Sequence, residues 1–437
     1  MKKYRLYLMA CLFLPLTIQA KVQLPDIISD HMVLQQNSKA QLWGKAKPNA
    51  QLTVKASWSE QIFSTKTGQD GKWLIAIDTP AAGYEPQTLT ISDGEALTLN
   101  DVLIGEVWFC SGQSNMEMPL NGFWNNPIMG ANESIANAAS YKGLRFANVT
   151  KKAAVTPQET CEGKWNTSTP DNLPWCSATA FHFATSLGKA LDVPVGIINC
   201  SWGGSKVEGW LPAEILKAYP DIDLSEAGKS GGTEYLQPMI MYNGMLKPLQ
   251  NYTIKGFLWY QGESNVGLHD TYPARLATMV ELWRKEWNLG ELPFYYAEIA
   301  PFIYGDGPNG VSGAYLREAQ YKAQSLIPNS GMITTNDLVE DYEADNIHPK
   351  NKTEVGKRLA YMALANTYGL KGIADRGPAY RSMEIKEGKA IVNFDNAKDG
   401  YNIMRDIRGF EIAGADGVFY PANARVVNHM QIEVSSE

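Results

Sequence analysis

The sequence is poor in the residues that bind metals, and it lacks a strongly basic segment. It contains five cysteines and five histidines among 437 residues, without a CxxC pair or a Cys/His spacing typical of zinc sites. The net charge is -7, and no dense run of lysine and arginine occurs. The composition therefore predicts no metal site and no nucleic-acid partner.

Long hydrophobic runs are also missing after the N-terminus, so we expect no membrane span. The exception is residues 1–20, where positive residues near the start precede an apolar stretch that ends near Ala20. This pattern is typical of a signal peptide and is too short for a comfortable span. The apolar run continues past Cys11, which favours simple export, periplasmic or secreted, over lipoprotein anchoring.

Export permits disulfide bonds, and four cysteines follow the signal. Cys161 and Cys176 flank a polar segment, and a bridge between them would close a short loop. Cys110 and Cys200 end apolar runs and are predicted to be buried thiols. The sequence leaves open whether Cys161 and Cys176 are joined.

The chain divides into three regions by its hydrophobic pattern, and 44% of its residues are hydrophobic, as in globular proteins. Residues 21–100 contain short β-branched segments separated by turn signals, which predicts a small β-sandwich. Residues 101–372 alternate strand and helix patterns, which predicts a parallel sheet covered on both faces. Residues 373–437 return to short strands and predict a second β module. The expected strands of the middle region are 105–110, 193–199, 254–260, 293–299 and 332–335, and its helices are 178–191, 274–287, 314–326 and 352–365.

Polar residues follow four of the strands expected in the middle region. In a parallel sheet, ligands bind beyond the carboxyl ends of the strands. A serine nucleophile needs a base, the base needs a carboxylate, and the oxyanion needs N–H donors. Each block alone has a structural explanation, such as a helix cap or a turn, but the four together favour a hydrolase. The blocks are GQSNM at 112–116, WGGS at 202–205, QGESN at 261–265 and DNIHP at 345–349.

These four blocks resemble those of the sialate O-acetylesterase family, within the SGNH/GDSL hydrolases. Residues 29–35 and 409–413 resemble its N-terminal β domain and its closing β module. The resemblance implies a three-layer α/β/α core with a parallel sheet at 101–372, flanked by β-sandwich-like modules. Members of that family continue past a strand like the last one here, so either this chain is shorter or its last sheet lacks an edge strand.

The resemblance also implies a role for each matching residue. Ser114 matches the nucleophile, His348 the base and Asp345 its carboxylate partner. Three groups would donate to the oxyanion. They are the N–H of Ser114, the N–H of Gly203 or Gly204 in the second block, and the side-chain amide of Gln261 in the third block. Many SGNH enzymes carry an asparagine in the third block, whereas this chain has Gln261 followed by Glu263. Glu263 is therefore a second candidate carboxylate.

The implied reaction is removal of O-acetyl groups from a sugar, of the sialate 9-O-acetylesterase type, through an acyl-enzyme and without a cofactor. An esterase for acetylated xylan or glucomannan would use the same residues. A catalytically dead carbohydrate-binding protein is the alternative from another class. Residues 117–175 and 206–250 are expected to form the loops that select the sugar. Tryptophans in or beside these loops are candidates for stacking on sugar rings, and they are Trp124, Trp165, Trp175 and Trp210.

Overall fold

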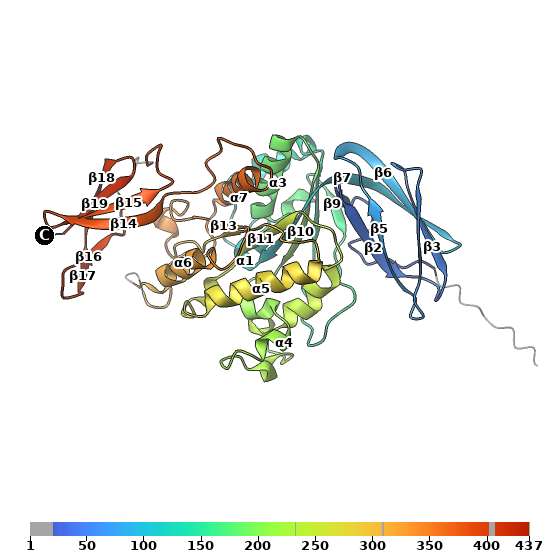
Figure 1. Cartoon of the computed structure of the whole chain (residues 1–437), viewed down its shortest axis with the longest axis horizontal. Coiled ribbons are helices and arrows are strands. Elements are labelled where there is room, and N and C mark those ends of the chain that lie inside the picture. Colours follow the sequence, from blue (N-terminus) through green and yellow to red (C-terminus); the bar gives the residue numbers. More distant parts are fainter. Residues whose placement is uncertain (1–20, 232, 308–309, 402–406, 437) are drawn as a thin grey trace, which may run out of the picture.

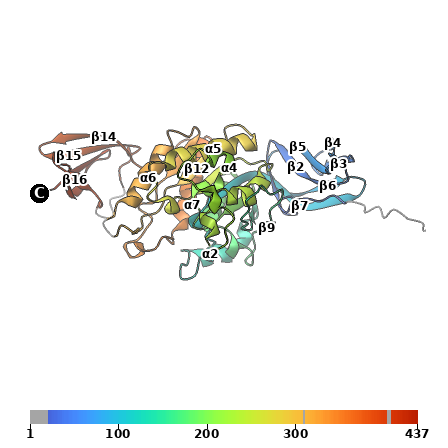
Figure 2. The ribbon, with the colours of Figure 1, turned by 90° about the horizontal axis from the view of Figure 1, so that it is seen from below.

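The computed structural model describes residues 21–231, 233–307, 310–401 and 407–436, so the predicted signal peptide lies outside the described residues. The chain forms three parts in a row along its longest axis (Figures 1 and 2). A β domain lies at one end, an α/β region in the middle and a small β module at the other end. No helix of the described residues is long and apolar enough to cross a membrane.

The middle region is built on a sheet of six parallel strands with an antiparallel strand at one edge. Two of these strands, β8 (Leu144–Asn148) and β9 (Trp165–Thr167), fall within residues 117–175, which we expected to form a loop. The order across the sheet is β13 (Ser330–Ile333), β12 (Phe294–Ala297), β11 (Gly256–Tyr260), β7 (Ala96–Gly112), β10 (Val195–Ser201), β8 (Leu144–Asn148) and the antiparallel β9 (Trp165–Thr167).

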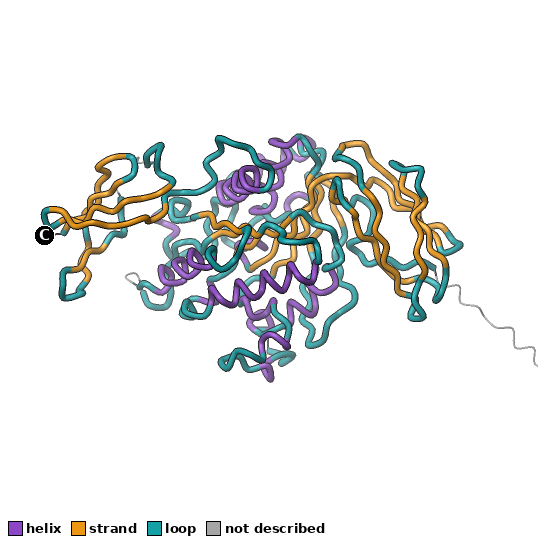
Figure 3. Tube along the Cα trace, in the orientation of Figure 1, coloured by secondary structure: helices purple, strands orange, loops and turns teal. Residues whose placement is uncertain are grey.

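Helices cover both faces of this sheet (Figure 3). Successive side chains of β7 point to opposite faces. Trp108 packs against Phe183 of α3 (Ala178–Leu191), with ring centroids 5.0 Å apart. Phe109 packs on the other face against Trp287 of α5 (Tyr272–Trp287) at 5.2 Å. Both faces of the strand are therefore apolar, as expected for a parallel sheet. The structure confirms the predicted α/β class. One face carries α3 (Ala178–Leu191) and α7 (Lys352–Asn366), the other α5 (Tyr272–Trp287) and α6 (Ser312–Ala323), and the shorter helices are α1 (Ser114–Glu117), α2 (Ala131–Ala136) and α4 (Ala213–Leu216).

The N-terminal β domain shares strand β7 with the middle region. The first half of β7 pairs with β6, and its second half pairs with β10 and β11. The boundary that we predicted near residue 100 therefore falls inside one continuous strand. The other strands of this domain are β1 (Val33–Gln35), β2 (Lys39–Lys45), β3 (Gln51–Ala56), β4 (Ile62–Lys66), β5 (Lys72–Asp78) and β6 (Gly83–Ser92).

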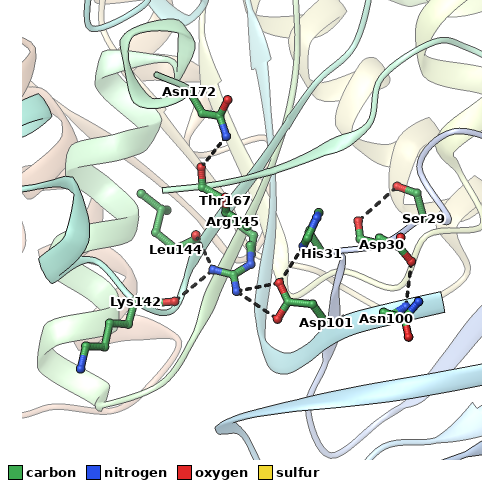
Figure 4. Close-up of polar contacts among 10 residues, drawn as sticks. All are labelled: Ser29, Asp30, His31, Asn100, Asp101, Lys142, Leu144, Arg145, Thr167 and Asn172. Carbon is green, nitrogen blue, oxygen red and sulfur yellow. Dashed lines mark hydrogen bonds and ion pairs between the residues drawn. The ribbon is translucent and has the colours of Figure 1, made fainter. Parts of the chain in front are cut away.

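A partly exposed group of charged side chains bridges the junction between these two parts (Figure 4). Asp101 lies in the middle of β7, and its Oδ2 is 2.6 Å from Nδ1 of His31 and 3.2 Å from Nη2 of Arg145. His31 belongs to the segment before β1, and Arg145 to β8 of the central sheet. One carboxylate thus connects the β domain to the core.

The C-terminal module is a thin antiparallel sheet with a small core of its own. Strand β19 lies inside this sheet, paired with β15 on one side and β18 on the other. The core consists of Ala390, Val392, Ile432 and Val434. The strands are β14 (Ala379–Lys386), β15 (Lys389–Asp395), β18 (Asn423–Asn428) and β19 (Gln431–Ser435), with β16 (Glu411–Ala413) and β17 (Phe419–Pro421) forming a separate pair.

All four cysteines of the described chain are buried free thiols, so no disulfide joins Cys161 to Cys176. The thiol of Cys176 is instead close enough to Cys110 to influence its ionisation, and Cys161 likewise influences Cys200. Burial raises the pKa of Cys110 and Cys200 well above the usual value, which keeps these thiols protonated and unreactive.

Candidate active site

The strand ends that carry the predicted blocks lie at one level of the sheet. Ser201 of β10 and Tyr260 of β11 both pair with Gly112, the last residue of β7. Ile333 of β13 is joined to the same level through β12. Gly112 has φ +135°, and a Cβ atom there would lie 2.1 Å from the carbonyl oxygen of Tyr260, so only glycine fits.

Ser114 begins helix α1 directly beyond this level. Its Oγ makes no hydrogen bond within the described part of the chain, and its N–H has no partner inside the helix, as is normal for a first residue. The residue is 9% exposed, so it is sheltered but reachable. Both groups are therefore available to a ligand.

Gly203 of the second block lies beside Ser114. A Cβ atom on Gly203 would be 3.3 Å from the Cβ of Ser114. The N–H of Gly203 donates to Oε2 of Glu117 at 2.5 Å, and Oε1 of Glu117 accepts from Lys151 at 2.7 Å. The backbone donor predicted from the sequence is thus next to the serine, but a carboxylate of α1 occupies it. The neighbouring Gly204 has φ +78°.

Gln261 of the third block has no donor left for an oxyanion. Its side chain is fully buried, and its Nε2 donates to the carbonyl of Ser205 at 2.9 Å and to Oδ1 of Asn265 at 2.7 Å. Its Oε1 accepts from the hydroxyl of Tyr272 at 3.0 Å. Because both amide hydrogens are in use, our prediction of Gln261 as an oxyanion donor does not fit this geometry. Gln261 instead joins the second block to the third.

His348 lies half-buried in the loop before α7. Its ring packs edge-on against Phe123, with the ring centroids 5.2 Å apart. Burial and the nearby charge of Lys352 lower the pKa of His348 to about 4, so the imidazole is neutral at pH 7, the form that a general base requires. Within the described residues no hydrogen bond joins His348 to Ser114, to Asp345 or to Glu263, and the side chain of Asp345 is exposed.

A buried polar cluster that the sequence analysis did not find lies beneath these residues. Asn115 is fully buried, and its Nδ2 donates to Oε1 of Glu263 at 2.5 Å and to the carbonyl of Ile347 at 3.0 Å. Its Oδ1 accepts from Nζ of Lys352 at 2.7 Å, and Lys352 also donates to the carbonyl of Pro349 at 2.7 Å. Asn115 therefore holds the nucleophile helix, the third block and the histidine loop together.

The electrostatics of this cluster reflect its burial. Burial raises the pKa of Glu263, and it lowers the pKa of Lys352 to about 7, while each charge favours the other. Lys352 stands in the first turn of an amphipathic helix, where a lysine is usually solvated. The sequence pattern therefore gave no reason to place it in the interior.

The four candidate tryptophans divide into two buried and two exposed residues. Trp165 and Trp210 are 4% and 0% exposed and belong to the core, so they are not available to a sugar. Trp124 and Trp175 are 89% and 62% exposed. Only these two are candidates for contact with a glycan.

The known proteins that resemble this chain include esterases that act on acetylated carbohydrates. Human sialate O-acetylesterase is 28% identical over 417 residues, which cover 88% of this chain and 79% of the human protein. The mouse sialate O-acetylesterase is 26% identical over 445 residues, with 88% and 81% covered. The crystal structure of a carbohydrate acetylesterase from Xanthomonas citri matches with a TM-score of 0.83 at 32% identity, over 95% of this chain and 92% of that chain.

A family match covers the middle region of the chain. Residues 104–365 match the family described as carbohydrate esterase, sialic acid-specific acetylesterase. The matched range is more than half of the chain and contains all four strand-end blocks. The chain therefore belongs to this family of carbohydrate esterases and is a carboxylic ester hydrolase.

Proposed function

We propose that the protein is an SGNH-type serine esterase that removes O-acetyl groups from sugars through an acyl-enzyme. The observation that carries the proposal is the placement of Ser114. Its unpaired hydroxyl stands at the start of α1, at the edge where the strand-end blocks converge. A serine kept only to cap the helix would use its hydroxyl on the backbone, and none of the hydrogen bonds of the described chain does so.

In the proposed reaction, His348 takes the proton of Ser114 as Oγ attacks the ester carbonyl. The N–H of Ser114 and a backbone N–H at Gly203 or Gly204 stabilise the oxyanion, each contributing about 3 kcal/mol to the transition state. For Gly203 to serve, the carboxylate of Glu117 must leave its N–H. The sugar alcohol departs with the proton from His348, and water then hydrolyses the acyl-enzyme by the same route. These steps need no cofactor.

We propose Asp345, rather than Glu263, as the partner of His348. Asp345 stands three residues earlier in the same loop, and its exposed carboxylate makes no hydrogen bond within the described chain. Catalytic hydrogen bonds are often loose before substrate binds. Glu263 is already bound to Asn115 and faces the charge of Lys352, which suits a positioning role.

The proposed substrate is an O-acetylated sugar of the sialate 9-O-acetyl type. Acetylated hemicellulose is the second candidate, because the same strand-end residues would hydrolyse its acetyl esters and a relative with a solved structure, at 32% identity, is a carbohydrate acetylesterase. The N-terminal pattern at residues 1–20 suggests that the enzyme works outside the cytoplasm.

The test is acetate release from 9-O-acetylated sialic acid and from acetylated xylan, with wild type and Ser114→Ala. The proposal predicts release from at least one substrate by wild type and from neither by the variant. Equal release by both proteins would exclude Ser114 as the nucleophile. Equal inertness on both substrates and on p-nitrophenyl acetate would favour a protein that only binds carbohydrate.

A further inference from the structure

Trp124 is exposed to a degree that is unusual for tryptophan. Its exposed fraction of 89% is the highest among the exposed large hydrophobic side chains of the described residues. Tryptophan is highly buried on average in folded proteins, because exposing its large apolar ring to water is unfavourable. An exposed ring of this size calls for an explanation outside the packing of the chain.

A tight turn fixes the backbone that carries Trp124. The N–H of Phe123 donates to the carbonyl of Asn126 at 3.1 Å, and the N–H of Asn126 donates back to Phe123 at 2.9 Å. Nδ2 of Asn126 also donates to the carbonyl of Trp124 at 3.0 Å, and Asn125 adopts φ 59°. Gly122 leads into the turn, and a Cβ atom there would lie 2.3 Å from the carbonyl oxygen of Asn126. Trp124 thus stands in a hydrogen-bonded turn.

This turn is next to the proposed general base. Phe123, at the base of the turn, packs against the ring of His348 at 5.2 Å between centroids. The chain before the turn is also fixed, because the N–H of Leu120 donates to the carbonyl of Cys176 at 2.9 Å. Trp124 is therefore the next residue along the chain after a side chain that contacts His348.

We propose that Trp124 is a platform for the sugar residue next to the acetylated one, so that the preferred substrate is an oligosaccharide or polysaccharide. This inference rests on the proposed function of Ser114 and His348. The acetyl ester must reach Ser114, which is 9% exposed, whereas the ring of Trp124 is 89% exposed and follows directly after the residue that packs against His348. The C–H face of a pyranose ring is apolar and matches the flat face of an indole, and its hydroxyl groups remain in water.

The experiment compares kcat/KM on matched oligosaccharide and monosaccharide esters. The pairs are O-acetylated sialyllactose with free O-acetylated sialic acid, and acetylated xylotetraose with acetylated xylose. Wild type is expected to prefer the oligosaccharide of the pair that it cleaves faster. In Trp124→Ala this preference falls roughly two- to tenfold, through KM for the oligosaccharide, because one aromatic contact is lost.

Two further variants make the result specific. Trp124→Phe retains an aromatic face and is expected to recover part of the preference. Phe419→Ala removes another highly exposed aromatic ring, 66% exposed, in the C-terminal module, and is expected to leave the preference unchanged. The proposal is overturned if wild type shows no preference in either pair, or if Trp124→Ala keeps it. Failure of the proposed function is recognised separately, since Ser114→Ala would then still hydrolyse p-nitrophenyl acetate.

Discussion

The side chains at the strand ends form two groups that differ in how many hydrogen bonds the protein already supplies. In the open group, Ser114, Asp345 and His348 have side chains without a hydrogen bond to one another or to the rest of the described chain. In the buried group, described above, every member is hydrogen-bonded and nearly or fully enclosed. The buried group consists of Asn115, Gln261, Glu263 and Lys352.

The difference assigns the two groups different roles: the open group carries out the reaction, and the buried group stabilises the site. A polar group in the interior costs free energy unless it is paired, and the hydrogen bonds of the buried group hold three segments together. The exception is Oε2 of Glu263, which is buried without a hydrogen-bond partner in the described chain. A reacting group needs unused donors or acceptors at the moment of reaction. Substitutions in the open group should therefore change catalysis, and substitutions in the buried group should change stability.

The largest effect is expected from Ser114→Ala. We expect kcat/KM to fall by at least about 10⁴-fold, because the nucleophile is lost. The free energy of unfolding should change by less than about 1 kcal/mol, because the hydroxyl makes no hydrogen bond. Acetate release and urea denaturation measure the two quantities. Ser264→Ala is the matched control, since its hydroxyl donates to the carbonyl of Gly204 at 2.8 Å. Equal catalytic losses in the two variants would contradict the division.

Lys352→Met should give the largest loss of stability. The substitution leaves Glu263 buried without its countercharge and removes two hydrogen bonds of 2.7 Å. Breaking a buried charge pair costs about 3–5 kcal/mol, which denaturant titration would detect. Lys357→Met on the same helix is the control. Its side chain is 38% exposed and its amino group pairs with Glu354 at the surface, so the expected change is below about 1 kcal/mol. A similar loss in both variants would show that burial is not the cause.

Gln261→Leu tests the residue whose predicted role did not fit the structure. Loss of its amide leaves buried partners unpaired and should destabilise the fold by about 2–4 kcal/mol. The kcat of the folded enzyme should fall by less than about tenfold, whereas loss of an oxyanion donor costs about 10²-fold or more. Gln320→Leu removes a similarly buried amide, which donates to the carbonyl of Gln261 at 2.9 Å. Gln261 would belong to the open group if its variant lost far more kcat than this control.

The smallest effect concerns the two carboxylates. The acid limb of kcat/KM reports protonation of His348, whose pKa burial and Lys352 lower to about 4. A carboxylate partner stabilises the imidazolium and raises this pKa, so Asp345→Asn should move the acid limb to lower pH by about 1 unit, or 1.36 kcal/mol. Glu263→Gln should leave the limb in place and lower stability instead. If the acid limb shifts in Glu263→Gln and not in Asp345→Asn, the carboxylate partner of His348 is Glu263.

Much of the fold could be predicted from periodicity. Helix α3 occupies the predicted residues 178–191, because apolar residues at helical spacing are buried from Ala178 to Leu187. Strand β8 was missed, because it is short and contains Arg145, whose charge is compensated by Asp101 from a distant strand. The boundary near residue 100 could not be predicted, because the two halves of β7 differ only in which strands pair with them.

For the site, the sequence alone determined the chemical types at the strand ends and their order along the chain. Ser114, the glycines and His348 each follow or approach a strand end, as the pattern indicated. Only the tertiary structure decided which groups are free. Gln261 and Glu263 carry the same functional groups in any fold, but here burial pairs them with Ser205, Asn265 and Asn115. Whether a polar group supports or reacts depends on its partners in space, and those partners come from segments far apart in the sequence.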